Sequence, residues 1–139
     1  MSEEPIIIYV DTNIYIDMIE SRKDKLRPLG DFAFYFFADG WNCKFKLVIS
    51  QHLVDELKRN VTDERKYKDI FDEFDKHKKL IFVKEEPQDK KNAEKYKESN
   101  DALHAILAKR AGVTYLVTRN LEDYSDCQSI VTVVLPEFV

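Results

Sequence analysis

Apolar residues follow two alternating patterns along the chain. The run IIIYV at residues 6–10 is short, β-branched and almost continuously apolar, which is typical of a strand buried on both faces of a parallel sheet. Comparable runs predict four more strands, at 44–49, 80–83, 115–118 and 130–135.

Between these runs, apolar residues recur at intervals of three or four, which predicts helices. Ser50 is expected to cap the helix that carries Leu53, Leu57 and Val61, and Gly40 to end the aromatic helix before it. Residues 88–98 follow a turn at Pro87 and form either an exposed helix or a mobile loop. Three other helices are expected at 12–22, 29–39 and 63–79. A last helix is expected to be capped by Ser99 or Asn100, to run through Ala111 and to end at Gly112.

Strands that alternate with helices predict an α/β fold, a parallel sheet of about five strands with helices on both faces and right-handed crossovers. The length of 139 residues suits one domain over 1–139. In open sheets of this kind, ligands bind beyond the carboxyl ends of the strands, where the strand order reverses. Candidate chemistry is therefore sought at strand-to-helix junctions.

Composition narrows the function classes. The net charge of -4 argues against a general nucleic-acid coat protein, and glycines are too few for a phosphate-cradling loop. Cys43 and Cys127 lie far apart and are expected to be reduced thiols rather than a disulfide or zinc knuckle. The first apolar run is too short for a signal peptide or a membrane span, so a cytoplasmic protein without a membrane partner is expected.

Four carboxylates occur at strand ends or on the following helices: Asp11, Glu56, Asp101 and Asp123. Each alone has an ordinary explanation, such as an N-cap for Asp11 or a helix-dipole contact for Asp101. Together they would repel, because two carboxylates about 4 Å apart cost about 4 kcal/mol at an effective dielectric near 20. An oxygen-rich site of this kind suits Mg²⁺ or Mn²⁺, cations that activate water toward phosphodiesters.

Three segments carry a family resemblance: VDTNIYID, ISQHLVDEL and NDALHAILAKRAGVTYLVTRNLEDY. In this order they resemble the PIN domain family, which includes the VapC-like toxin ribonucleases of toxin–antitoxin pairs. The resemblance implies a parallel sheet between helices. It also implies that Asp11, Glu56 and Asp101 surround one or two divalent ions and that the substrate is RNA.

The chain departs from the fullest family pattern at Asn120, where an Asp often follows Thr-Arg. Asn120 is expected to be a neutral auxiliary ligand, with Asp123 supplying charge, which weakens a second metal site. The resemblance also implies that Asn13 and Thr118 support the Asp11 carboxylate. Arg119, inside the Thr-Arg-Asn segment, is the predicted substrate-binding residue.

Other polar and aromatic residues are interpreted more plainly. His52 and His104 are assigned to ordinary helix packing and left outside the site. The segment FAFYFF is expected mainly in the core, with a dimer interface or an antitoxin groove as the alternative. Lysines before Asp101 are expected to form a solvated face, with RNA contact as the alternative: Lys84, Lys90, Lys91, Lys95 and Lys97.

The sequence therefore predicts a Mg²⁺- or Mn²⁺-dependent endoribonuclease of the PIN type, with RNA as substrate and a second copy or an antitoxin as partner. The departure at Asn120 favours one rival, a catalytically weak or inactive PIN module that binds RNA or serves in assembly. A second rival is a receiver- or phosphatase-type domain in which Asp11 is phosphorylated. The absence of an Asp-x-Asp pair at the first strand disfavours it.

Overall fold

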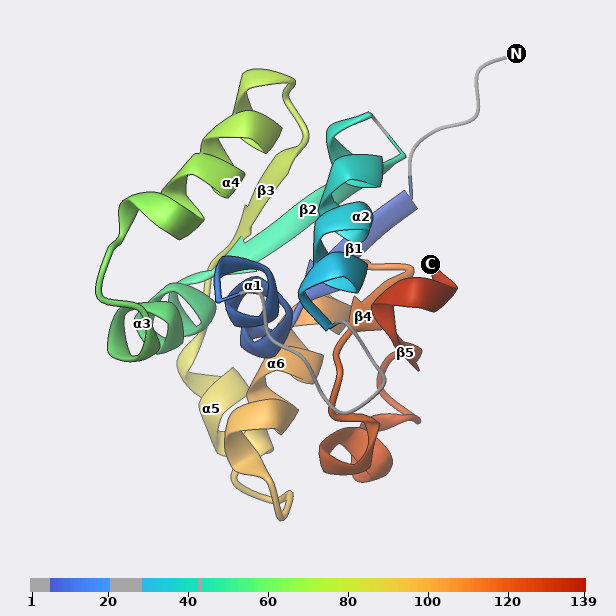
Figure 1. Ribbon diagram of the computed structural model, residues 1–139. Coiled ribbons are helices and arrows are strands. Elements are labelled where there is room, and N and C mark those ends of the chain that lie inside the picture. Colours follow the sequence, from blue (N-terminus) through green and yellow to red (C-terminus); the bar gives the residue numbers. More distant parts are fainter. Residues whose placement is uncertain (1–5, 21–28, 43) are drawn as a thin grey trace.

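The computed structural model describes residues 6–20, 29–42 and 44–139. Its centre is a parallel sheet of five strands in the order β3-β2-β1-β4-β5 (Figure 1), which confirms the predicted α/β class. The short β5 has only two residues, fewer than predicted, and pairs with β4. The strands are β1 (Ile6–Val10), β2 (Phe45–Ser50), β3 (Leu80–Val83), β4 (Tyr115–Val117) and β5 (Val133–Val134).

Two hydrophobic cores cover the two faces of the sheet. Because neighbouring side chains of a strand point to opposite faces, Ile8 and Val10 enter one core and Tyr9 enters the other. Helices α1 (Thr12–Ile19), α2 (Leu29–Trp41), α3 (Gln51–Asn60) and α4 (Arg65–Lys76) pack on the first face. Helices α5 (Pro87–Ala93) and α6 (Ser99–Arg110) pack on the second, with the 3-10 segment η1 (Leu121–Cys127).

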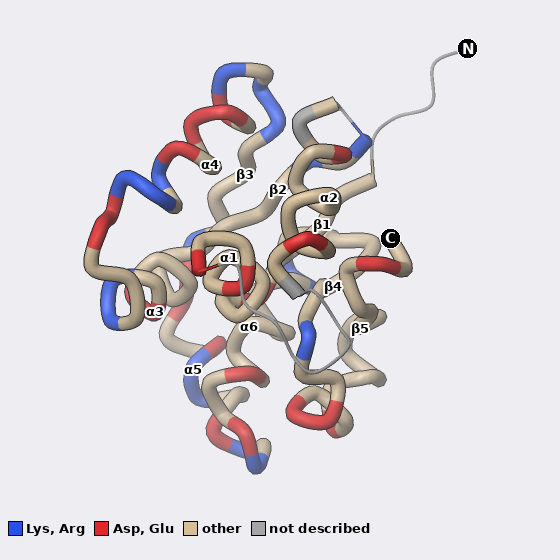
Figure 2. Tube along the Cα trace, viewed as in Figure 1, with Lys and Arg blue, Asp and Glu red and all other residues tan. Residues whose placement is uncertain are grey.

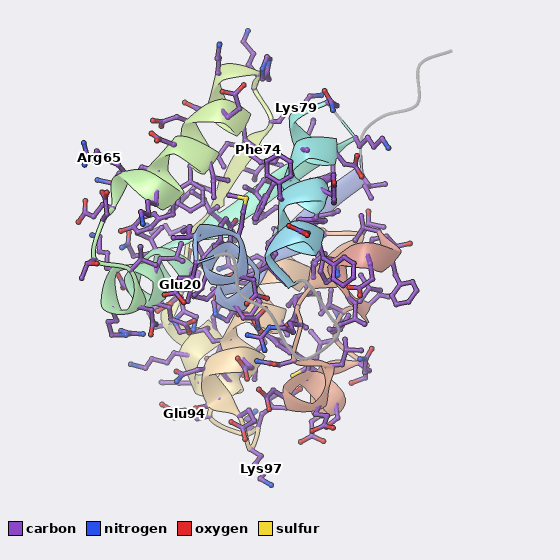
Figure 3. All side chains as sticks on the ribbon, viewed as in Figure 1. Glu20, Arg65, Phe74, Lys79, Glu94 and Lys97 are labelled. Carbon is purple, nitrogen blue, oxygen red and sulfur yellow. The ribbon has the colours of Figure 1, made fainter. Side chains whose placement is uncertain are left out.

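Helix α2 runs past Gly40, so the prediction that this glycine ends the helix is wrong. A Cβ atom at Gly40 would lie 2.5 Å from Cζ of Phe45 and 2.6 Å from Cζ of Phe74. Phe74 points from α4 toward α2 (Figure 3), so the glycine lets α2 pack closely on both rings. Its role is close packing rather than a left-handed turn.

Helix ends elsewhere agree with the sequence in part. Ser50 caps α3 as predicted, accepting a hydrogen bond from the backbone N–H of Leu53 at 3.1 Å. Helix α4 is shorter than the predicted 63–79, since Lys78 adopts a left-handed conformation with φ 58° that ends helical bonding. The end of the predicted helix 12–22 and Cys43 lie outside the described residues, while Cys127 is a buried free thiol.

The open alternatives for 88–98 resolve into a short helix that begins at Pro87. Glu86 and Asp89 form a capping box, so this proline starts a helix instead of marking only a turn. The N-cap of α6 is Glu98, not Ser99 or Asn100 as predicted. A second 3-10 segment, η2 (Pro136–Phe138), follows β5. Among the described residues, no helix is both long and apolar enough to cross a membrane.

Candidate functional site

The strand order reverses between β1 and β4, and Asp11 directly follows β1 at this point. Val10 pairs with Val117, and the backbone N–H of Asp11 donates to the carbonyl of Val117 at 2.9 Å. Asp11 therefore leaves the sheet beside Thr118, which follows β4. This is the crevice in which open α/β sheets bind ligands.

The Asp11 carboxylate is buried and fully oriented by its neighbours. One oxygen, Oδ1, accepts the backbone N–H of Thr12 at 2.7 Å, so Asp11 does cap α1. The other oxygen, Oδ2, accepts from Asn13 Nδ2 and from Thr118 Oγ1, each at 3.0 Å. Asn13 and Thr118 thus contact the carboxylate for which the sequence selected them.

Asn13 also links the helix to the segment after β4. Its Nδ2 donates to Thr118 Oγ1 at 3.0 Å, and its Oδ1 accepts the backbone N–H of Arg119 at 3.1 Å. The backbone N–H of Asn120 donates to Thr118 Oγ1 at 3.1 Å. These bonds tie the Thr-Arg-Asn segment to the start of α1, so the carboxylate and the loop keep one relative geometry.

Glu56 reaches the same crevice from α3. Its Oε2 accepts from Thr12 Oγ1 at 2.6 Å, which places it next to the residue that follows Asp11. Figure 1 shows α1, α3 and α6 meeting near the ends of β1 and β4, as the contacts of Glu56 require. The sequence suggested only that Glu56 lies beside the buried stripe of its helix.

Two histidines flank Glu56, although the sequence interpretation left both outside the site. Oε1 of Glu56 lies 3.1 Å from His104 Nε2 and 3.2 Å from His52 Nε2, and the two rings are 4.4 Å apart. His104 Nε2 is also 3.8 Å from Asp11 Oδ1. The i,i+4 spacing of His52 and Glu56 was the available signal. Nothing in the sequence alone indicated that His104 on α6 meets them.

A buried hydrogen-bond chain holds His104 from behind. Its Nδ1 is 2.6 Å from the Tyr9 hydroxyl, which is 2.7 Å from Ser50 Oγ. Ser50 is therefore both the cap of α3 and the end of this chain. Since Tyr9 and His104 have no exposed surface, the ring is fixed with Nε2 directed at the carboxylates.

The surroundings of Glu56 lower its pKa. Burial alone would raise the pKa of Glu56, but hydrogen bonding and charge from His104, with Thr12 and His52, lower it to about 2. Burial would likewise lower the pKa of His104, yet Glu56, Asp11 and Asp101 raise it. Glu56 is thus ionised at neutral pH and lies between two histidine rings.

Asp101, in the first turn of α6, has the opposite environment. Its pKa is raised to about 7 by burial, and the carboxylates of Asp11, Asp123 and Glu56 contribute to the rise. The residue before Asp101, Asn100, contacts His52 Nε2 through its carbonyl oxygen at 3.1 Å, so the start of α6 lies beside α3 at the crevice. Among the described residues, the carboxylate of Asp101 has no hydrogen-bond or ion-pair partner.

Asp123 and Asn120 border the crevice on the side of η1. Asp123 is exposed, and its backbone N–H donates to the carbonyl of Asn120 at 3.1 Å. A surface cavity of about 510 Å³ lies over this loop. Its lining includes Arg119, Asn120, Glu122, Asp123 and Leu135. The roles of Asn120 and Asp123 as ligands stay predictions.

Arg119 has a partner that the sequence did not indicate. Its Nε donates to Oδ2 of the buried Asp17 on α1 at 2.9 Å, and its Nη1 is 3.5 Å from Asn120 Oδ1. This ion pair joins the Thr-Arg-Asn segment to α1. Substrate binding by Arg119 stays a prediction.

Tyr124 is a further member of the site that the sequence did not single out. Burial and the charges of Asp11 and Asp101 raise its pKa well above the ordinary range, so the hydroxyl stays protonated. Its position after Asp123 in the motif NLEDY was the only signal. The buried hydroxyl has no hydrogen-bond partner among the described residues.

The donor set fits a divalent cation. Carboxylates come from the end of β1, from α3 and from α6, and burial together with the charges of Asp11, Asp123 and Glu56 raises the pKa of Asp101 to about 7. Carboxylate oxygens are the ligands of Mg²⁺ and Mn²⁺. His52, Glu56 and His104 have ligand atoms close enough to hold one ion together. Imidazole nitrogens increase the affinity of a site for Mn²⁺ and other transition metals above that of a site with oxygen ligands alone.

The fold and the site place this chain in the class of α/β proteins that have an acidic crevice at the topological switch point of the sheet. The family model described as PIN domain matches residues 8–122, and the chain belongs to the PIN domain family. Among curated proteins, no significant match is found.

Three solved structures share the fold. VapBC2 of Rickettsia felis, bound to a DNA fragment from its promoter, has 16% identity and a TM-score of 0.59, covering 94% of this chain and 98% of that chain. FitAcB of Neisseria gonorrhoeae has 18% identity and a TM-score of 0.61, covering 95% and 99%. FitAB bound to an IR36 DNA fragment has 20% identity and a TM-score of 0.57, covering 95% and 96%.

Proposed function

We propose that residues 1–139 form a single-domain, metal-dependent endoribonuclease of the PIN type. The observation that carries the proposal is the approach of Asp11 and Glu56 at the switch point, where His104 Nε2 lies 3.8 Å from Asp11 Oδ1 and 3.1 Å from Glu56 Oε1. Asp101 lies three residues before His104 on α6. Proteins of the PIN domain family are nucleases, which supports hydrolysis of phosphodiester bonds. A cytoplasmic location fits RNA as the substrate.

The cation would be held by Asp11, Glu56 and Asp101, with Asp123 and Asn120 available from the loop. When bound, Mg²⁺ or Mn²⁺ supplies Lewis acidity for the phosphate and activates water. His52 and His104 beside Glu56 favour Mn²⁺ of the two, because Mg²⁺ prefers oxygen ligands alone.

The residues of the chain contribute position and charge. Thr12, Asn13 and Thr118 fix both oxygens of Asp11, so this carboxylate needs no reorganisation when a ligand binds. His104, held by Tyr9, fixes Glu56 in the same way. Preorganised charge of this kind is the main source of rate enhancement in phosphoryl chemistry.

The partner proposed is an antitoxin protein, which would make this chain the toxin of a pair. The similar structures are VapBC and FitAB complexes. Helix α2 presents Phe34 and Tyr35 at 51% and 67% exposure, while Phe36 and Phe37 of the same segment are in the core. FAFYFF is thus in the core in part, as predicted, and its exposed half is the surface proposed for the antitoxin or a second copy.

The test is cleavage of single-stranded RNA during Mn²⁺ titration, comparing wild type with Asp11→Asn. Asp72→Asn, an exposed acid on α4, is the matched control. We expect cleavage by wild type and the control, and loss of cleavage in Asp11→Asn. Cleavage that survives Asp11→Asn would overturn the mechanism. Wild-type protein that binds Mn²⁺ and RNA without cutting would instead establish the rival, an inactive PIN module, which Asn120 favours.

A further inference from the structure

A groove beside the acidic crevice has the features of a nucleic-acid surface. It has a volume of about 480 Å³, and its lining includes Phe82, Arg59, Lys84, Lys90, His52 and Asn100. We call it the Phe82 groove. Figure 1 shows β3, α3 and α5, from which most of these residues come, along one side of the molecule.

Phe82 is an aromatic residue in an unusual place. It lies on β3, an edge strand of the sheet, and its side chain is 56% exposed. Its neighbour Val83 is buried, because alternate positions of a strand face opposite sides. An exposed phenylalanine in a groove is not needed for the core, so its ring is available to a ligand.

Three cationic side chains line the same groove as this ring. Arg59 comes from the last turn of α3, Lys84 follows β3, and Lys90 lies on α5, all exposed. Within the part of the chain that the structure describes, none of the three side chains has an ion-pair partner. Basic positions mark α3 and α5 on this side of the tube (Figure 2).

Two acids also line the groove, Asp55 and Glu85. Asp55 accepts a hydrogen bond from Gln51 Nε2 at 2.8 Å, which occupies one of its oxygens. The groove therefore carries three cations against two anions in a chain of net charge -4. This local excess of positive charge complements a polyanion.

The groove leads directly to the crevice through His52 and Asn100. His52 Nε2 lies 3.2 Å from Glu56 Oε1 and 3.1 Å from the carbonyl oxygen of Asn100, the residue before Asp101. A strand lying in the groove would thus continue toward the carboxylates. The groove and the site share one wall.

We propose that the Phe82 groove binds the single-stranded segment of RNA that flanks the scissile phosphate, with one base stacked on Phe82 and phosphates contacted by Arg59, Lys84 and Lys90. Base stacking on aromatic rings together with backbone cations is the general mode of single-strand binding. The proposal rests on the proposed function, since it assigns this groove to the substrate of that site.

The experiment measures binding of a fluorescent 12-nucleotide RNA to the full chain in EDTA, where cleavage cannot occur. Phe82→Val, which keeps a strand-forming side chain, is expected to weaken binding about tenfold, whereas Phe82→Tyr keeps it. Phe34→Val, an equally exposed phenylalanine on α2, is the control and leaves binding unchanged.

Lys84→Ala and Lys90→Ala are each expected to reduce the slope of log affinity against log salt by about 0.7, with Lys76→Ala on α4 as control. Equal binding by wild type and Phe82→Val would overturn the proposal. Absence of RNA binding by wild type would also overturn the proposal. A peptide strand paired with the edge of β3 would then be the alternative ligand.

Hydrolysis of bis(p-nitrophenyl) phosphate separates the two proposals, because this small diester needs the crevice but not the groove. We expect the groove variants to hydrolyse it at the wild-type rate. If wild type binds RNA through Phe82 but never hydrolyses the diester, the proposed function fails and the groove stands. If the diester is hydrolysed while Phe82→Val binds RNA normally, only the groove fails.

Discussion

Glu56 and Asp101 are two carboxylates that face one crevice from different helices, and their pKa values move in opposite directions. Burial would raise both, but His104, Thr12 and His52 lower the pKa of Glu56 to about 2. Burial and the neighbouring acids Asp11, Asp123 and Glu56 raise the pKa of Asp101 to about 7. The difference lies in the partners, not in the chemical group.

This contrast divides the crevice into a compensated half and an uncompensated half. On the Glu56 side, the protein itself supplies the positive charge and the hydrogen-bond donors. On the Asp101 side, His104 lowers the pKa of Asp101 only in part, and burial with the charges of Asp11, Asp123 and Glu56 outweighs it. We therefore expect a divalent cation to gain most beside Asp101, where it would relieve repulsion and displace a proton.

The largest effect is expected from Asp101→Asn. The change removes the charge that a cation would neutralise, so RNA cleavage should fall by about 10²–10³-fold. Asp72→Asn on α4 should cleave normally. Single-turnover cleavage at saturating Mn²⁺ measures the difference. Cleavage by Asp101→Asn within a factor of two of wild type would remove Asp101 from the proposed metal site.

The second prediction concerns substitutions at His104 and His52, on the Glu56 side of the crevice. Removing an imidazole that orients or completes the site should reduce Mn²⁺ affinity by about tenfold for His104→Asn, and less for the more exposed His52→Asn. Affinity for Mg²⁺ should fall less than affinity for Mn²⁺, because Mg²⁺ prefers oxygen ligands. Titration calorimetry with each metal measures both constants.

His77→Asn is the matched control for these variants. Nε2 of His77, the C-cap of α4, lies 3.5 Å from Oε1 of Glu73, which precedes it by four residues. The two residues form the same kind of histidine–glutamate pair on a different helix from the crevice histidines. Substitution of His77 should leave both affinities unchanged. Equal affinities in His104→Asn and His77→Asn would show that the histidines serve only to pack α3 against α6.

Much of this architecture follows from the sequence, for local reasons. Each predicted strand occurs in the structure, because buried parallel strands are short apolar runs that periodicity identifies well. The edge of the sheet that carries the site was predictable once the sheet was taken as parallel, since Asp11 and Thr118 then both follow carboxyl ends of strands. That β1 and β4 are neighbours came from the structure. Gly40 was misinterpreted because a close contact with Phe45 and Phe74 has no local signature.

The contacts that the sequence did not predict join distant elements. His104 meets Glu56 only because α6 and α3 approach the crevice from opposite faces of the sheet, at an angle that periodicity does not encode. The ion pair of Arg119 with Asp17 spans more than a hundred residues for the same reason. Exposure of Phe82 depends on β3 being an edge strand, and strand order is likewise not a local property.

The smallest effect is on stability, and it has opposite signs in the two halves. The pKa of Glu56 is lower in the folded protein than in the unfolded chain, so its contribution to the free energy of unfolding is present above about pH 4.5 and is lost as pH falls toward 2. The pKa of Asp101 is higher when folded, so its contribution is present below about pH 4 and is lost as pH rises to 7.

In the metal-free protein, the free energy of unfolding should rise between pH 2 and 4.5, and Glu56→Gln should make this rise smaller. The free energy of unfolding should fall between pH 4 and 7, and Asp101→Asn should make this fall smaller. Each change should amount to about 1 kcal/mol, because partial exposure screens both carboxylates. Urea unfolding at closely spaced pH values measures it, with Glu73→Gln beside His77 as the control. If both variants shift stability in the same direction over these windows, the two halves of the crevice do not differ in charge compensation, and the placement of the cation beside Asp101 loses its basis.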